Sequence, residues 1–158
     1  ENMRSLSVPT QAEGCVVDPR DGTLYVGEEV AGIWRFPKNG TAGEMVAGID
    51  NQYMVADVEG LALVTKCETG GYLVASSQDD NAYAEYSFPD VTQLGPFNIA
   101  QGAFGATQET DGIALVEGSF GPQYPGGLFV AQDGMNEPAA QNFKLADWGA
   151  IKAAMGLE

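Results

Sequence analysis

Short apolar runs separated by glycine-rich and polar turns fill most of the chain, and they recur in one order. Each repeat starts with an acidic residue, a glycine and an apolar run, at Glu13-Gly14, Glu59-Gly60 and Asp111-Gly112. The starts lie 46 residues apart between positions 13 and 59 and 52 apart between positions 59 and 111. This spacing indicates a structural unit that is repeated three times.

Further strands follow each start. A second apolar run is present in all three repeats, at 24–27, 72–75 and 128–131. A third run, at 32–36 and 82–88, largely alternates apolar and polar residues, as expected of a sheet with two different faces. A four-stranded unit that recurs every 40 to 50 residues or so is typical of a β-propeller blade, whereas a β-solenoid would repeat at a much shorter period. We therefore predict an all-β fold in which residues 1–158 form about three blades of a β-propeller.

Three blades do not close a ring, because closed propellers have about four to eight. An open half would leave strand edges unpaired. We expect the ring to be completed by the other half of a longer chain, by a second copy or by a companion fragment. The last segment departs from the strand pattern: Asp147 is placed to cap a short C-terminal helix over 148–155, with Gly156 as its stop.

The charge of the chain limits the kinds of partner that it is expected to bind. The chain has 22 acidic and 7 basic residues, no histidine and a formal net charge of −15. Such a surface repels nucleic acid and anionic lipid, and no apolar run reaches the roughly 18 residues of a membrane helix, so neither nucleic acid nor membrane is an expected partner. Carboxylate and amide oxygens suit Ca²⁺ better than zinc or copper. Without histidine, a histidine-activated nucleophile is excluded, and any hydrolysis would depend on metal.

Two cysteines, Cys15 and Cys67, leave the redox state open. They allow one disulfide, a bridge from each to other sequence, or two buried thiols.

Equivalent positions of successive blades form rings around the propeller axis. One ring is predicted at the repeat starts, and a second at the ends of the second strands; Asp57, two residues before Glu59, faces the same side as Glu59. These side chains would hold several Ca²⁺ ions, each with about six to eight oxygen ligands. The alternative is that acid–glycine pairs merely start strands at solvated turns. The predicted ring residues are Glu13, Glu59 and Asp111, and then Glu29, Gln78 and Asp133.

Two polar loops are weaker candidates. Residues 133–137, which include Asp133 and Asn136, are similar to a short calcium loop but lack the length and spacing of an EF-hand. Residues 78–81 fit a simple turn at least as well as they fit a metal-binding loop.

With these residues in place, the chain resembles the β-propeller phytases, calcium-dependent enzymes that remove phosphate from inositol hexakisphosphate. The resemblance covers nearly the whole chain. The segments that carry it include Glu13-Gly14, Leu24-Tyr25-Val26-Gly27-Glu28-Glu29, Asp57-Val58-Glu59-Gly60-Leu61, Thr110-Asp111-Gly112, Gly121-Pro122-Gln123-Tyr124-Pro125 and Gln141-Asn142-Phe143-Lys144.

The resemblance implies that the chain is the C-terminal half of a six-bladed ring. It also implies hydrolysis of an inositol phosphate substrate by metal-activated water and a secreted or periplasmic location. Asp133 and Asn136 match a structural calcium loop, while Gly105 stands where the family usually has a further aspartate. The residues that match positions around the active-site Ca²⁺ ions are Glu13, Glu29, Asp57, Glu59, Gln78 and Asp111.

In the β-propeller phytases, the basic residues that bind phosphate lie mostly in the N-terminal blades. This half alone is therefore expected to bind substrate poorly. The alternative function is a calcium-stabilised binding module, or an inactive fragment, without turnover. A different calcium-dependent hydrolase on a propeller fits the ring but not the extended motif matches.

Overall fold

The computed structural model describes residues 4–157, which form three antiparallel sheets and one α-helix. Within each sheet the strands are hydrogen-bonded to their neighbours in chain order. The first sheet contains β1 (Ala12–Val17), β2 (Leu24–Glu28), β3 (Gly32–Phe36) and β4 (Glu44–Gly48). The second contains β5 (Val58–Lys66), β6 (Gly70–Ser77), β7 (Ala82–Ser87) and β8 (Thr92–Phe97). The third contains β9 (Ile113–Val116), β10 (Leu128–Asp133) and β11 (Asn142–Asp147).

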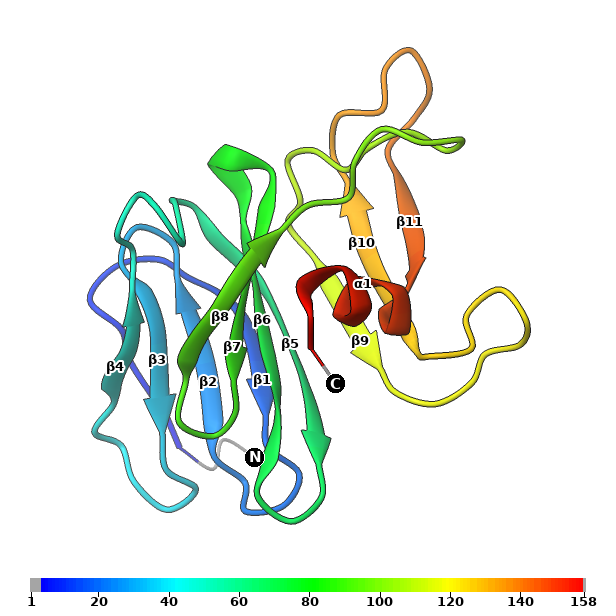
Figure 1. Ribbon diagram of the computed structural model, residues 1–158. Helices are drawn as coiled ribbons and strands as arrows, with labels where there is room; N and C mark the ends of the chain where they lie inside the picture. The colour runs from blue at the N-terminus through cyan, green and yellow to red at the C-terminus, as the bar shows by residue number, and fades with distance from the viewer. Residues whose placement is uncertain (1–3, 158) are drawn as a thin grey trace.

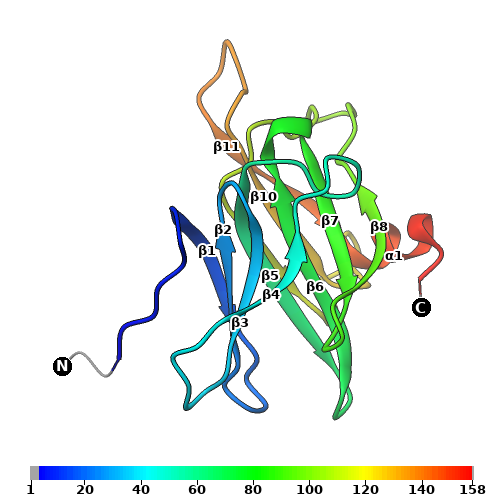
Figure 2. The same cartoon turned by 90° about the vertical axis from the view of Figure 1, so that its left-hand side faces the viewer.

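The three sheets follow one another as blades, with the first strand of each blade innermost. Strand β1 lies against β5, and β5 lies against β9 (Figure 1). A view turned by 90° shows the antiparallel strands of the first two blades aligned roughly along one axis (Figure 2). The predicted all-β fold built from propeller blades is confirmed. The expected four-stranded unit holds for the first two blades, whereas the third has three strands among residues 4–157.

The glycine of the repeated acid–glycine pair marks the closest approach between blades. A Cβ added to Gly14 would overlap the carbonyl oxygen of Glu59, and one added to Gly60 would lie 2.8 Å from both the carbonyl oxygen of Asp111 and the backbone nitrogen of Ile113. Only a residue without a side chain allows the inner strands to come this close. The repeat in the sequence therefore reflects contact between blades as well as the start of a strand.

Each face of the middle blade is covered by a different core. Tyr86 in β7 packs in the core shared with the first blade, which also contains Tyr25 and Ile33. On the opposite face, Tyr83 packs against Phe129 of the third blade with ring centroids 5.0 Å apart. Because both faces are buried, β6 and β7 consist largely of buried residues.

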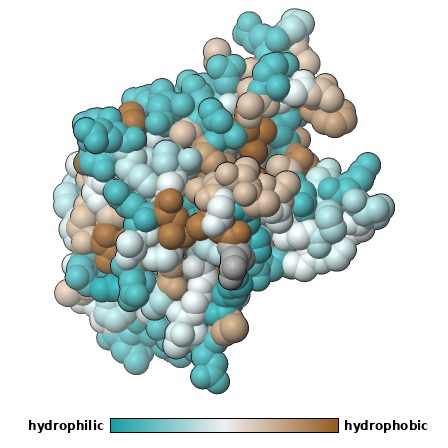
Figure 3. Space-filling view, in the orientation of Figure 1, coloured by the Kyte–Doolittle hydropathy of each residue, from teal (hydrophilic) through white to brown (hydrophobic). Residues whose placement is uncertain are grey.

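Helix α1 (Trp148–Met155) has the bounds that its capping residues predict, which confirms the predicted C-terminal helix. The Ala150 backbone N–H donates to the Asp147 carboxylate at 2.9 Å, and Gly156 ends the helix with a φ of +73°. Trp148 is fully buried between the second and third blades. Apolar side chains gather around α1 in the middle of the face shown in Figure 3, and the surrounding loops are hydrophilic. No helix in residues 4–157 is long and apolar enough to cross a membrane.

Both cysteines are free and exposed. Of the three possibilities that the sequence left open, two buried thiols are therefore wrong, because Cys15 lies on an exposed position of β1 and Cys67 in the turn between β5 and β6.

One buried carboxyl group gives the fold a pH dependence. Glu85 in β7 is fully buried, and neither of its carboxyl oxygens has a hydrogen-bond partner among the described residues. Burial raises its pKa to about 7 from a usual value of 4.5, although the charge of Lys152 opposes the shift. A raised acid pKa stabilises the fold below the unfolded-state pKa, and this contribution is lost as the pH rises from about 4.5 to about 7.

Glu85→Gln should remove this loss. We expect the stability of the variant, relative to the unsubstituted protein, to increase by about 3 kcal/mol between pH 4.5 and pH 7.5. Urea unfolding across this range measures the difference, with Glu68→Gln, at an exposed glutamate, as the control. Parallel pH profiles for the Glu85→Gln variant and the unsubstituted protein would show that Glu85 has the same pKa in the folded and unfolded states.

Candidate metal site

Three carboxylates from two blades converge at one end of the inner strands. Glu13 lies in β1, Glu29 directly follows β2, and Glu59 lies in β5. One carboxylate oxygen from each lies within 4.8 Å of the others, and all three side chains are half-buried. The structure thus brings together acids that the sequence places in two predicted rings.

Backbone hydrogen bonds between the blades fix this convergence. The Glu29 N–H donates to the Gln11 carbonyl oxygen at 3.0 Å, which anchors the end of β2 beside β1. The Val58 N–H in turn donates to the Glu29 carbonyl oxygen at 2.9 Å, which holds the second blade to the first next to Glu59. The backbone beside Glu29 and Glu59 is therefore hydrogen-bonded between neighbouring segments.

Two more predicted ring residues, Gln78 and Asp111, together with Asp57, extend the group toward the third blade. The Gln78 side-chain amide donates to the Asp111 carboxylate at 2.6 Å, and the Gln78 backbone N–H donates to the Asp57 carbonyl oxygen at 3.0 Å. Asp57 immediately precedes β5, while Asp111 lies two residues before β9. Five acids and one amide thus surround the inner ends of three blades.

Burial and neighbouring carboxylates raise the pKa of three acids in this group, Glu29, Asp57 and Glu59. For Glu59, burial is the largest cause, followed by the charges of Glu13 and Asp111, and together they raise its pKa to about 7. The pKa of Glu29 is also raised, by burial and then by Asp57 and Glu13. None of the ion pairs found in residues 4–157 involves these acids, so their charge is not balanced by lysine or arginine.

This donor set fits a hard divalent cation. Ca²⁺ takes carboxylate and amide oxygens, and a cation placed among like charges relieves the repulsion that raises their pKa values. The group could therefore hold a divalent metal ion.

Two further residues belong to the site: Gln132, which was not predicted from the sequence, and Asp79, which was predicted only as part of the polar loop 78–81. The charge of Asp79, in the 3₁₀ turn Gln78–Asp80, contributes to the raised pKa of Asp57 after burial does. The Gln132 side-chain oxygen accepts from the Asp111 backbone N–H at 2.8 Å. The signal for Gln132 is its place at the end of the third repeat's second strand, directly before Asp133.

Asp133 does not turn toward this group. It is buried, with one carboxylate oxygen 2.9 Å from the Lys144 ammonium and the other accepting from the Gln108 backbone N–H at 3.1 Å. Asn136 also accepts from Lys144, at 3.2 Å. In this structure the Asp133 carboxylate therefore faces a lysine of the neighbouring strand. Calcium binding by Asp133 and Asn136 stays a prediction.

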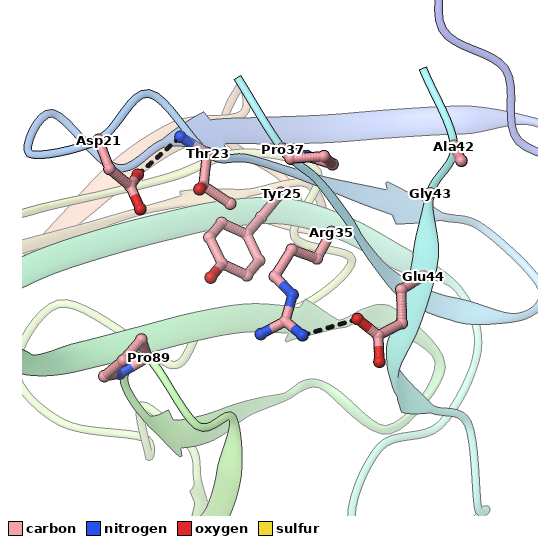
Figure 4. Close-up of a pocket in the computed structure, with 9 residues that line it drawn as sticks. All are labelled: Asp21, Thr23, Tyr25, Arg35, Pro37, Ala42, Gly43, Glu44 and Pro89. Atoms are coloured by element: carbon pink, nitrogen blue, oxygen red, sulfur yellow. Dashed lines mark hydrogen bonds and ion pairs between the residues drawn. The ribbon is translucent and has the colours of Figure 1, made fainter. Parts of the chain in front are cut away.

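A pocket of about 510 Å³ lies away from the carboxylates, at the end of the first blade where β2 begins (Figure 4). Its Arg35 guanidinium is paired with Glu44 at 2.7 Å, and no predicted site residue lines it. It therefore adds nothing to the metal site. The lining residues are Asp21, Thr23, Tyr25, Arg35, Pro37, Ala42, Gly43, Glu44 and Pro89.

Comparison with known proteins identifies the family. The family model described as Phytase matches residues 1–158. The 3-phytase of Bacillus subtilis (strain 168) is 37% identical over 165 aligned residues, which cover 99% of this chain and 43% of that relative. The chain thus spans less than half the length of the curated relative it matches. The family match extends over all the carboxylates described above, and the chain belongs to the phytase family.

Proposed function

We propose that this chain supplies the calcium-binding part of an enzyme that hydrolyses phosphomonoesters of phytate (myo-inositol hexakisphosphate) and releases inorganic phosphate. The observation that carries the proposal is the convergence of Glu13, Glu29 and Glu59 within 4.8 Å in a member of the phytase family. An unbalanced cluster of acids is unsuited to binding a polyanion unless cations lie between them.

The side chains have distinct roles in this proposal. Glu13, Glu29 and Glu59 hold calcium directly, and Asp57 and Asp111 add negative charge that keeps it bound. Gln78 positions the Asp111 carboxylate through its 2.6 Å hydrogen bond. Bound calcium would supply a polarised water and neutralise phosphate oxygens. None of these residues acts as a covalent nucleophile.

The substrate requires groups that this chain has in short supply. With 7 basic against 22 acidic residues, it offers few cationic side chains to a phosphate. We infer that a further part of a longer protein, or a companion chain, contributes the basic residues and completes the ring. The 43% coverage of the Bacillus subtilis 3-phytase supports this inference. A secreted or periplasmic location, where calcium is plentiful, is part of the same proposal.

Phosphate release from phytate by the full-length protein tests the proposal. We expect release in millimolar calcium, loss of release in excess EGTA and recovery when calcium is restored. The few basic residues of this chain favour a second candidate, a calcium-stabilised binding module without turnover. That candidate is supported if calcium raises the unfolding temperature but no phosphate is released, and phosphate release that persists in EGTA would contradict calcium dependence.

A further inference from the structure

The ammonium group of Lys144 lies among side-chain oxygens at the β10–β11 hairpin of the third blade. Lys144 lies in β11, opposite Ala131 of β10, and its side chain is 9% exposed. The loop that joins these strands carries Asn136, while Asp133 and Asn142 form the pair at the end of the hairpin. The side-chain oxygens of these three residues all point at the lysine.

The ammonium group is fully satisfied by these oxygens. Its nitrogen lies 2.9 Å from Asp133 Oδ2, 2.8 Å from Asn142 Oδ1 and 3.2 Å from Asn136 Oδ1. An ammonium group has three N–H donors, so each donor has one acceptor here. Gly105 lies beside it, and a Cβ added there would be 3.6 Å from Lys144 Cε.

The surroundings hold the acceptors in place. Asn136 donates through its amide nitrogen to the Ala140 carbonyl oxygen at 2.8 Å, which turns its own oxygen toward the lysine. Asp133 is held from the other side by the Gln108 backbone N–H, and its side chain is only 3% exposed. A charged carboxylate is costly to bury unless a cation or hydrogen bonds compensate it, and here the cation is Lys144 of the chain itself.

These residues do not fit calcium while Lys144 is in place. Calcium needs six to eight oxygens at about 2.3–2.6 Å, and a positively charged ammonium at the centre of the loop repels a divalent ion. Gly105, beside Lys144, has no side chain and supplies no further carboxylate.

We infer that Lys144 is the permanent cation of the β10–β11 loop and that this loop is ordered without a divalent metal. Calcium binding by the chain is then confined to the carboxylates at the inner ends of the blades. This inference does not depend on catalysis, because it concerns only which oxygens hold a metal.

Equilibrium dialysis of calcium with the full-length protein provides the first test. We expect Asp133→Asn to bind as many calcium ions per molecule as the unsubstituted protein, and Glu59→Gln to bind fewer. Loss of one calcium ion in Asp133→Asn would overturn the inference. An unchanged number of bound calcium ions in Glu59→Gln would instead contradict the proposed calcium site. The number bound by Asp133→Asn would still test the role of Lys144.

Thermal unfolding in EGTA provides the second test, and it applies even if Asp133→Asn fails to fold. Lys144→Met leaves the Asp133 carboxylate buried without a cation, so its unfolding temperature should fall by about 5 °C or more. Lys38→Met, at an exposed lysine, is the matched control and should be unchanged. Equal unfolding temperatures for Lys144→Met and the unsubstituted protein would show that the ammonium does not hold the loop.

Discussion

Glu59→Gln is expected to lower calcium-dependent phosphate release by the full-length protein more than about 100-fold while leaving the fold intact. Glutamine keeps the shape of the side chain but removes the charge at the position where the charges of Glu13 and Asp111 meet. Loss of an anionic ligand weakens the hold on calcium. The same change removes a repelling charge, so in EGTA the variant should be at least as stable as the unsubstituted protein.

Rate and stability measured side by side separate the two effects. Phosphate release is followed in millimolar calcium, and thermal unfolding in EGTA. Glu68→Gln is the control, because Glu68 lies exposed in the turn at the other end of β5 in the same blade. Near-normal turnover in Glu59→Gln would remove Glu59 from the metal site, and a lower unfolding temperature in EGTA would contradict the repulsion between these acids.

Gly60→Ala is expected to destabilise the 158-residue chain by about 3 kcal/mol. The added methyl group would meet backbone atoms of Asp111 and Ile113 at 2.8 Å, and backbone cannot move aside as the end of a flexible side chain can. The inner strands β5 and β9 would have to separate. Urea unfolding monitored by tryptophan fluorescence reads the change, since Trp148 is buried between these blades.

Gly112→Ala is the matched control. Gly112 occupies the same position in the third repeat, and nothing among the described residues lies within 4 Å of the place where its Cβ would be. We expect its stability to stay within about 0.5 kcal/mol of the unsubstituted chain. Equal losses in the two variants would mean that the effect comes from the alanine itself and not from contact between blades.

The repeat and the helix could be predicted because their signals are local. The acid–glycine starts at 13, 59 and 111 mark where each inner strand begins or is about to begin. Asp147 and Gly156 set the bounds of α1 through their own backbone and side-chain bonding. Such signals need no knowledge of what packs against them.

The outer strands could not be placed in the same way. Strand β8 contains both Gly95 and Pro96, and most of its residues are partly or fully exposed, so neither composition nor alternation identifies it. Strand β11 was recognised only as part of a family motif, because Phe143 and Leu145 on it are exposed. The orientation of Asp133 also depended on Lys144, a partner that alignment of the repeats does not reveal.

Because Glu13 and Glu29 belong to the first blade and Glu59 to the second, a cation held by all three joins two separate sheets. Its binding energy then contributes to the association of the blades as well as to the site. By thermodynamic reciprocity, such a cation strengthens the association of the blades by the same factor by which that association raises the affinity for the cation. Metal affinity and the association of the blades are therefore coupled.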